Sequence, residues 1–404
     1  MPKPAYDRII PFVAARSLSS FGRQVVNTAV LWELYKRTDS KLAIAGVGAV
    51  QVLPVILLFV SAGTVVDRSD RRRLMTACSL FTGLVGLGLA LASWSNAPLG
   101  TYYALLAAQG AISAFSSPGG GSLLPLIVER HDLDVANRVG STAQELATII
   151  GPAIAGLSLS QLAPFWVYGF VAITGLLSGA LYRALPEPRK IEAPATNARK
   201  DWRVGLRFIF NSPLLLPALT LDMFAVLFAG VVALLPVIAT DILHAGPLGY
   251  GVLRASESVG AVLMAIIGGR IAPWKRPGRV LLIVVALFGV ATSLIGMSTS
   301  LPLTVGLLVI CGALDNISVV IRLTLEQIVV PDAIRGRVSA VHYVFIGMSN
   351  ELGAAESGVA AWAIGTVPAI IGGGAIAVVV AGIVAAKWRA FSRMPPLAEL
   401  KPPD

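Results

Sequence analysis

Long apolar stretches recur along almost the whole of this chain, and they restrict its fold more than any other feature. Twelve of them are each about as long as the roughly 20 residues that a helix needs to cross a bilayer. Backbone polar groups inside a bilayer have to be hydrogen-bonded within the protein, which favours helices. The sequence therefore predicts an all-α integral membrane protein with twelve transmembrane helices, at residues 9–34, 42–66, 73–94, 100–127, 138–162, 164–184, 213–240, 248–272, 279–299, 301–330, 338–364 and 366–388.

The composition also indicates a membrane as the solvent. Of the 404 residues, 55% are hydrophobic and 13% are charged, whereas about 25% are charged in a typical soluble domain. A soluble fold could not hide so many apolar side chains, because much of any folded surface meets water. The formal net charge is +10, but the basic residues stand in short clusters between apolar runs. This distribution predicts a lipid bilayer as partner and no nucleic acid.

The basic residues predict the orientation of the chain. If the N-terminus is cytoplasmic, the outside connections hold Lys36, Arg37 and Lys41, and nearly all other Lys and Arg between spans fall inside. This positive-inside bias predicts that both termini are cytoplasmic. Arg16 and Arg23 interrupt the first apolar run, which makes it a poor signal peptide, so we expect it to be retained as the first helix.

The longest connection between apolar runs divides the chain into two halves. It contains PEPRKIEAPATNARK, typical of a flexible linker, and DWRVGLRFIF, which has the pattern of a short amphipathic helix at the interface. The predicted organisation is an N-terminal six-helix half (1–185), a cytoplasmic linker with that helix (186–212), a C-terminal six-helix half (213–390) and a cytoplasmic tail (391–404).

The two halves carry related sequences. Residues 109–139 can be aligned with 311–338 so that Gly110 lies opposite Gly312 and Arg138 opposite Arg337. GPAIAG at 151–156 likewise falls on GAAESG at 353–358. These matches indicate a parallel duplication, which is a common plan of membrane transporters.

Two motifs resemble those of a known family. GTVVDRSDRRRLM lies between the second and third predicted helices, and IIGPAIAG lies in the fifth. With them the chain resembles the major facilitator superfamily, in particular its twelve-helix branch of drug and siderophore exporters, such as enterobactin and macrolide exporters. The matching positions are Gly63, Asp67, Arg68, Arg71 and Arg72 (followed by Arg73) in the loop motif, and Gly151, Pro152 and Gly156 in the antiporter-like motif.

The resemblance implies a gating role for the loop motif. Asp67 would cap the N-terminus of the helix that begins near Arg337, and Arg71 would pair with Glu129 or Asp132. Contacts of this kind would favour closure on the cytoplasmic side. The alternative is that the arginines only fix the topology. For the glycines of the fifth helix, the alternatives are close packing alone or an additional seal against leak.

The chain departs from the family pattern at three places. Asp70 replaces a small residue of the loop motif, and Ala155 replaces a glycine of the antiporter motif. Many proton-coupled exporters carry an arginine before a Gln-Gly pair in the fourth helix, but here Leu106 precedes Gln109 and Gly110. This last difference weakens the transfer of proton coupling from those relatives.

Charged residues inside the predicted spans are candidates for coupling or substrate binding, because they are costly there and usually face a cavity or a partner. Arg254 with Glu257, and Arg322 with Glu326, have the spacing of local ion pairs. The candidates are Arg16, Arg23 and Asn27 on one face of the first helix, Glu145, Asp222, Arg254, Glu257, Asp315, Arg322, Glu326 and Glu351.

Four of these acids have no oppositely charged neighbour one helical turn away: Glu145, Asp222, Asp315 and Glu351. In a low dielectric, a carboxyl group without a cation favours its neutral form and can carry a proton. We expect Asp222 and Glu145 to be the foremost coupling residues. Arg16 and Arg23 would pair with such acids or bind an anionic substrate, and His342 is expected to be a packed residue.

The sequence and the resemblance together predict a secondary active transporter that works by alternating access. The leading hypothesis is a monomeric, proton-coupled exporter of an amphipathic, drug-like or siderophore-like small molecule in the inner membrane of a bacterium. A proton gradient is the expected energy source, with no cofactor, because no Walker motif is present. Three distant histidines and two isolated cysteines suggest neither an enzyme nor a metal site. The alternatives are a lipid or lysolipid flippase, and a uniporter or importer of a polar solute.

Overall fold

The computed structural model describes residues 6–188, 202–268 and 274–400, and all regular secondary structure in these ranges is helical. The longer elements are α1 (Tyr6–Thr38), α2 (Lys41–Arg68), α3 (Arg71–Trp94), α4 (Leu99–Ile127), α5 (Leu133–Gln161), α6 (Pro164–Ala184), α7 (Trp202–Asn211), α8 (Leu215–Ala229), α10 (Gly246–Gly268), α11 (Pro277–Met297), α12 (Leu301–Val329), α13 (Asp332–Ile364) and α14 (Thr366–Lys387). Short elements are η1 (Arg130–Asp132), η3 (Val231–Leu234), α9 (Leu235–Val237), η4 (Ile238–Ile242), α15 (Arg389–Ser392) and η5 (Leu397–Glu399).

Eight helical segments within the described residues are long and apolar enough to cross a membrane. They are Lys41–Leu58, Arg71–Trp94, Pro164–Ala184, Leu215–Ile242, Gly246–Gly268, Pro277–Met297, Leu301–Val329 and Thr366–Lys387. Helices α1, α5 and α13 have the length but carry several charged residues, and α4 is uncharged but rich in Gly and Ser. The total of twelve spans and the cytoplasmic location of the termini therefore stay predictions.

One predicted helix is interrupted. The run 213–240 was expected to be continuous, but α8 ends at Ala229, and a 3₁₀ turn, one α-turn and a π-turn follow. Gly230 has φ −75° and ψ 84°, outside the helical range. Pro236, six residues on, lacks the amide hydrogen of a regular helix and crowds the preceding turn. Helix α13 also begins earlier than predicted, at Asp332 instead of residue 338.

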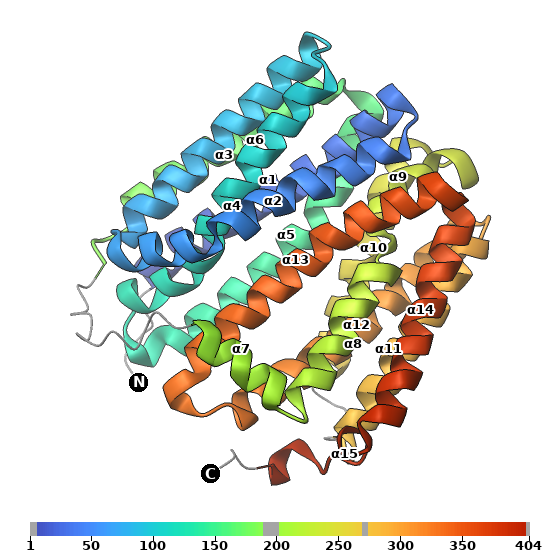
Figure 1. The fold of residues 1–404 in the computed structure, drawn as a ribbon. Helices are drawn as coiled ribbons and strands as arrows, with labels where there is room; N and C mark the ends of the chain where they lie inside the picture. The colour runs from blue at the N-terminus through green and yellow to red at the C-terminus, as the bar shows by residue number, and fades with distance from the viewer. Residues whose placement is uncertain (1–5, 189–201, 269–273, 401–404) are drawn as a thin grey trace. The chain divides into compact units, whose positions relative to one another are not determined.

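The chain forms two compact units. The first contains residues 1–193 and 245–255, and the second contains residues 194–244 and 256–404. In the first unit, α3 and α6 run side by side (Figure 1). Glycines allow this approach, since a β-carbon added to Gly86 would lie 2.9 Å from the amide nitrogen of Ala172.

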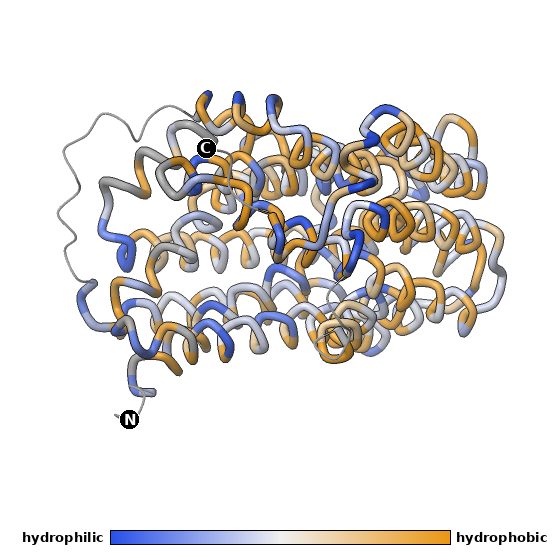
Figure 2. Tube along the Cα trace, turned by 90° about the horizontal axis from the view of Figure 1, so that it is seen from below, coloured by the Kyte–Doolittle hydropathy of each residue, from blue (hydrophilic) through white to orange (hydrophobic). Residues whose placement is uncertain are grey.

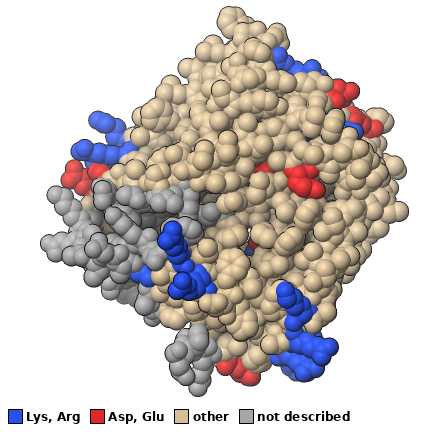
Figure 3. Space-filling view, in the orientation of Figure 1, with Lys and Arg blue, Asp and Glu red and all other residues tan. Residues whose placement is uncertain are grey.

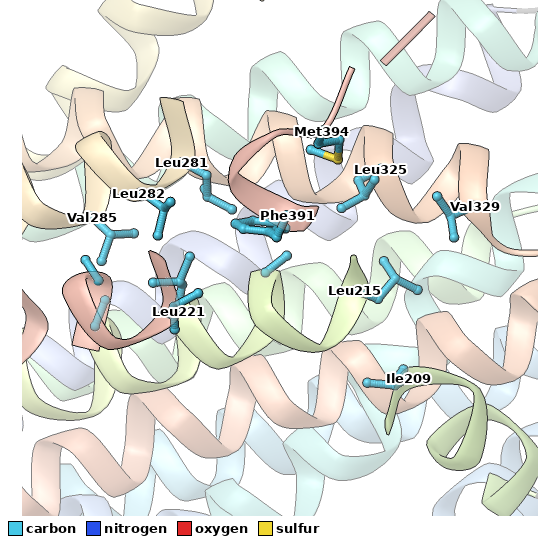
Figure 4. Close-up of a cluster of buried hydrophobic side chains, with 14 of the residues drawn as sticks. Ile209, Leu215, Leu221, Leu281, Leu282, Val285, Leu325, Val329, Phe391 and Met394 are labelled. Atoms are coloured by element: carbon cyan, nitrogen blue, oxygen red, sulfur yellow. The ribbon is translucent and has the colours of Figure 1, made fainter. Parts of the chain in front are cut away.

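In the second unit, α11 and α14 make the corresponding close pair (Figure 1). A β-carbon on Gly374 would lie 2.8 Å from the amide nitrogen of Ser293. A buried apolar cluster joins residues of α7, α8, α11, α12, α13, α14 and the C-terminal segment. Figure 4 shows Phe391 and Met394 within it, 0% and 1% exposed. The region predicted as a simple tail (391–404) therefore begins with residues that help to form the core of this unit.

The predicted duplication has a counterpart in helix packing. Gly110 of α4 lies directly against the backbone carbonyl of Gln51 on α2, within the first unit. Gly312 of α12 lies in the same way against the backbone carbonyl of Glu257 on α10, within the second unit. The glycines that the sequence aligns are thus both at close helix crossings, where a side chain would not fit.

The exposed apolar side chains are most regular on α3, α6, α11 and α14. On α3 they include Leu80, Leu84, Leu87 and Leu91, at the three- and four-residue spacing of one helix face. Hydrophobic positions prevail along the helices in Figure 2. On the face shown in Figure 3, most of the described surface carries neither Lys and Arg nor Asp and Glu. Such a surface suits contact with lipid.

Candidate functional site

Helices α8, α12 and α13 of the second unit enclose a cluster of charged side chains. Asp222 of α8 and Arg322 of α12 are 7% and 3% exposed, and an Arg322 Nη1 atom contacts Asp222 Oδ2 in an ion pair. Arg322 Nε also lies 3.3 Å from the backbone oxygen of Ser318 and 3.2 Å from its hydroxyl oxygen. The guanidinium group is therefore held from two sides, by its own helix and by Asp222.

A second buried pair lies further along α12. Glu326 is 5% exposed and contacts His342 Nδ1 of α13, and it also accepts a hydrogen bond from the Ser339 hydroxyl. His342 is 3% exposed and lies close enough to Asp222 to interact with it electrostatically. Glu326 thus links α12 to α13, while Arg322 links α12 to α8.

Asp315 completes the polar stripe of α12. Asp315, Ser318, Arg322 and Glu326 follow at intervals of three or four residues, which places them on one helix face. A cavity of about 20 Å³ is lined by Asp222, Asp315, Ser318 and by apolar side chains, including Val284, Val285 and Phe288 of α11. That is enough space for about one water molecule. The charged cluster therefore has room for about one water molecule at one end and is tightly packed at the other.

One sequence-based interpretation of this cluster, a local ion pair between Arg322 and Glu326, is wrong. Arg322 pairs with Asp222 and not with Glu326, so Asp222 does have an oppositely charged partner. Glu326 contacts His342 instead, and His342 is a packed residue, as predicted, that also belongs to the polar cluster. The spacing on α12 gives the polar face correctly, but the sequence does not tell which neighbouring helix supplies each partner. Pairing of Arg254 with Glu257 stays a prediction, as does any role of half-buried Glu351.

The candidates in the first unit form no comparable cluster among the described contacts. Glu145 of α5 is exposed, and its expected coupling role stays a prediction. Arg16 and Arg23 are half-buried on α1, and Asn27 accepts a hydrogen bond from Gln51 Nε2 at 3.4 Å. A possible pairing of Arg16 and Arg23 with acids elsewhere, or with an anionic substrate, stays a prediction.

A polar network at the other end of α1 was not predicted. Glu33 Oε1 accepts hydrogen bonds from the hydroxyls of Tyr102 and Ser93, both at 2.8 Å. Arg37 donates to the Tyr102 hydroxyl at 2.8 Å and to the backbone oxygen of Ala97 at 3.0 Å. The network ties α1 to α3 and α4 within the first unit. Its signal in the sequence is weak, because the partners lie 60 or more residues apart.

The loop motif is described in part. The side chains of Asp67 and Arg68 and the surroundings of Gly63 lie outside the described residues, so the capping role of Asp67 is untested. Arg72 donates to the backbone oxygen of Leu185 at 2.8 Å and lies 3.8 Å from Glu187, which ties the loop to the end of α6. Pairing of Arg71 with Glu129 or Asp132 stays a prediction.

Asp70, the residue that departs from the family pattern, is the N-cap of α3. Its carboxylate accepts hydrogen bonds from the backbone amides of Arg72 and Arg73 at 2.9 and 3.2 Å. It thereby satisfies two of the amides that a helix leaves unpaired at its start. An acid at this position is also favoured by the helix dipole.

We expect Asp70→Ala to destabilise the start of α3 by about 1 kcal/mol, the usual cost of removing a helix cap. Asp70→Asn, which keeps an acceptor oxygen, should lose less. Hydrogen exchange of the amides of Arg72 and Arg73 would measure the effect. Equal protection of these amides in the wild type and in Asp70→Ala would contradict the capping role.

The antiporter-like motif lies at a close helix contact. A β-carbon on Gly156 would lie 2.8 Å from both the amide nitrogen of Gly251 and the carbonyl oxygen of Pro247, at the start of α10. A β-carbon on Gly151 would lie 2.8 Å from Cβ of Gln24 on α1. Both contacts lie within the first unit, and they agree with the packing interpretation of Gly151, Pro152 and Gly156. The additional role as a seal stays a prediction.

Apolar helices in two compact units, with several charged side chains buried between helices, are typical of membrane transporters. Comparison with known protein families identifies the family of transporters, because residues 12–354 match the Major Facilitator Superfamily. The chain belongs to this superfamily, and it is a transporter and not an enzyme.

Relatives and solved structures agree with this assignment. The chain is 28% identical over 307 residues to an enterobactin exporter of Escherichia coli O1:K1 / APEC. The aligned region covers 73% of this chain and 71% of that protein. Its fold is similar to a bacterial homologue of the human lysosomal transporter Spinster, with TM-score 0.73, 14% identity and coverage of 98% and 100%. A D-xylose–proton symporter gives TM-score 0.75, 13% identity and the same coverage.

Proposed function

We propose that this protein is a proton-coupled exporter of an amphipathic small molecule, drug-like or siderophore-like, that works by alternating access. It would act as a monomer in the inner membrane of a bacterium, with both termini in the cytoplasm. The direction of transport is supported by the similarity to enterobactin exporters. The loop motif around Asp67 and Arg71 would favour closure on the cytoplasmic side, as the family resemblance implies.

The observation that carries the coupling proposal is the buried charge cluster of the second unit. Charges placed inside a membrane are expensive, and they mark ion or proton pathways when they are retained. Here Asp222, Arg322, Glu326 and His342 are each 3–7% exposed. Packing alone does not require these four charged or polar side chains, because apolar residues of similar size would fill the same space with a smaller desolvation penalty.

Protonation of one acid in this cluster would change its net charge by one unit. In a low dielectric, that change alters the attraction between α8 and α12 substantially. A transporter that exchanges between two conformations would then favour one of them when protonated and the other when deprotonated. This coupling is what exchange of protons for an exported molecule requires.

The test is proton flux in inverted membrane vesicles. Respiration acidifies the vesicle interior and quenches a pH-sensitive dye, and compounds are then added singly: cationic drugs, macrolides, siderophores and lysolipids. We expect recovery of the dye signal with at least one amphipathic compound, and none in vesicles without the protein. Recovery only with lysolipids would favour a flippase. Uptake of a labelled compound that produces no dye recovery would overturn proton coupling.

A further inference from the structure

The polar groups around the α8–α11–α12 cavity do not balance in charge. Asp222 and Asp315 each bring a negative charge in their ionised forms, and Arg322 brings one positive charge. Glu326 is engaged separately by His342 and Ser339. One negative charge is thus left over within predicted membrane spans, where an uncompensated charge is costly even on a half-buried side chain such as Asp315.

The geometry shows which acid lacks compensation. Arg322 forms an ion pair with Asp222, and its guanidinium group donates hydrogen bonds to Ser318 on the other side. Among the described residues, Asp315 has neither a hydrogen-bond donor nor an ion-pair partner. It interacts with Arg322 and Asp222 only through longer-range electrostatics. The structure therefore separates a fixed ion pair from a second carboxyl group that has no permanent partner.

The elements packed around Asp315 supply few other charges. Asp222 comes from α8, and His342 of α13 lies within electrostatic reach of Asp222. Helix α10 contributes Glu257, whose backbone carbonyl contacts Gly312, one turn before Asp315. The carboxyl group of Glu257 also interacts electrostatically with Cys311. Helix α11 contributes the apolar side chains of Val284, Val285 and Phe288 to the cavity. Apart from Arg322 and, when protonated, His342, these neighbours add no positive charge.

We propose that Asp315 is the proton carrier of this transporter, and that the cavity between α8, α11 and α12 is its proton-binding site. Asp222 and Arg322 stay paired, and the proton binds to and leaves the carboxyl group of Asp315 through water in the cavity. The inference deepens the proposed function and rests on it for the role in transport. It replaces Asp222 and Glu145, the two candidates that the sequence favours most, with Asp315 of α12.

A proton fits this site better than a metal cation. Hard cations take six or more oxygen ligands, or keep several waters. The cavity offers the carboxyl groups of Asp222 and Asp315 and the hydroxyl of Ser318, and its other lining residues are apolar. Its volume of about 20 Å³ accommodates about one water molecule. Arg322 would also repel a cation there.

Infrared spectroscopy of the purified full-length protein tests the site without a substrate. A protonated carboxyl group has a C=O stretch distinct from that of a carboxylate, so its band can be followed through a pH titration. We expect a titrating band in the wild type that is missing in Asp315→Asn and returns in Asp315→Glu. The matched control is Glu356→Gln, which removes a half-buried acid of α13 outside the cluster and should keep the band.

Several outcomes would overturn the assignment. The band could persist in Asp315→Asn, or the wild type could show none, and either result excludes Asp315 as carrier. A band that disappears when Na⁺ replaces K⁺ at constant pH and ionic strength would indicate a metal cation site instead. Thermal unfolding followed by tryptophan fluorescence would establish that Asp315→Asn is folded, since Asn has nearly the same shape as Asp.

Inverted vesicles connect the site to transport and separate the two proposals. If the wild type moves protons on addition of a compound, Asp315→Asn should bind that compound but produce no dye recovery, whereas recovery at the wild-type rate would overturn the inference. If the wild type shows uptake of a compound without proton flux, the proposed coupling fails, and the infrared result still decides whether Asp315 binds a proton.

Discussion

Removing the charge of Arg322 in Arg322→Gln should destabilise the protein by about 3–5 kcal/mol and abolish transport, because it leaves Asp222 buried without its partner. Asp222 is 7% exposed, so water cannot replace the guanidinium group. The hydrogen bonds to Ser318 would be lost as well. Thermal unfolding of the purified protein and compound flux in vesicles measure the two effects.

The double variant Asp222→Asn/Arg322→Gln provides the decisive control. It removes both charges and leaves two neutral amides that can hydrogen-bond, so it should recover much of the stability lost in Arg322→Gln. Arg207→Gln on the exposed face of α7 controls for the loss of an arginine as such. Equal stability of Arg322→Gln and Arg207→Gln would refute the importance of the buried pair. A double variant no more stable than Arg322→Gln would show that charge imbalance is not the cause.

The sequence predicts the polar face of α12 but not its partners. Periodicity places Asp315, Ser318, Arg322 and Glu326 on one side of a helix, because that depends on local geometry alone. The choice of Asp222 over Glu326 as partner of Arg322 depends on how α8 and α12 pack, which is a tertiary property. The contact of His342 with Glu326 could not be predicted for the same reason, since it spans two helices.

The apolar runs predict where helices lie but not where they break. Gly230 and Pro236 both stand in the run 213–240, and membrane helices tolerate Gly and Pro often enough that neither alone predicts an end. Burial of Phe391 was also not predictable, because a single aromatic residue after a basic segment has no periodic pattern. By contrast, the role of Asp70 follows a local rule, an acid just before a helix, that the family motif obscured.

The aligned glycines of the two halves are a case in which sequence comparison gave a correct structural hint. Gly110 and Gly312 were paired by alignment alone, and each lies against a backbone carbonyl of another helix. A duplicated ancestor would keep such a position in both halves, because no other residue allows the same approach of two backbones. This argument also predicts that the two positions respond alike to mutation.

Gly312→Val should therefore prevent normal packing of α10 against α12 and strongly reduce the yield of folded protein. The added side chain would meet the backbone carbonyl of Glu257, and backbone atoms cannot move aside as a flexible side chain can. Overpacking of this kind typically costs about 1–3 kcal/mol, and more where backbones have to separate. Displacing α12 would also shift Asp315, one turn further on, and so disturb the proposed proton site.

Gly306→Val is the matched control on the same helix, because a β-carbon there meets nothing within 4 Å. Both substitutions place a β-branched residue in α12 and carry the same cost in helix propensity. Fluorescence-detected size-exclusion chromatography and thermal unfolding of the two variants isolate the packing effect. We expect Gly306→Val to resemble the wild type and Gly312→Val to aggregate or unfold at a clearly lower temperature. Similar behaviour of the two variants would show that the close crossing at Gly312 does not limit stability.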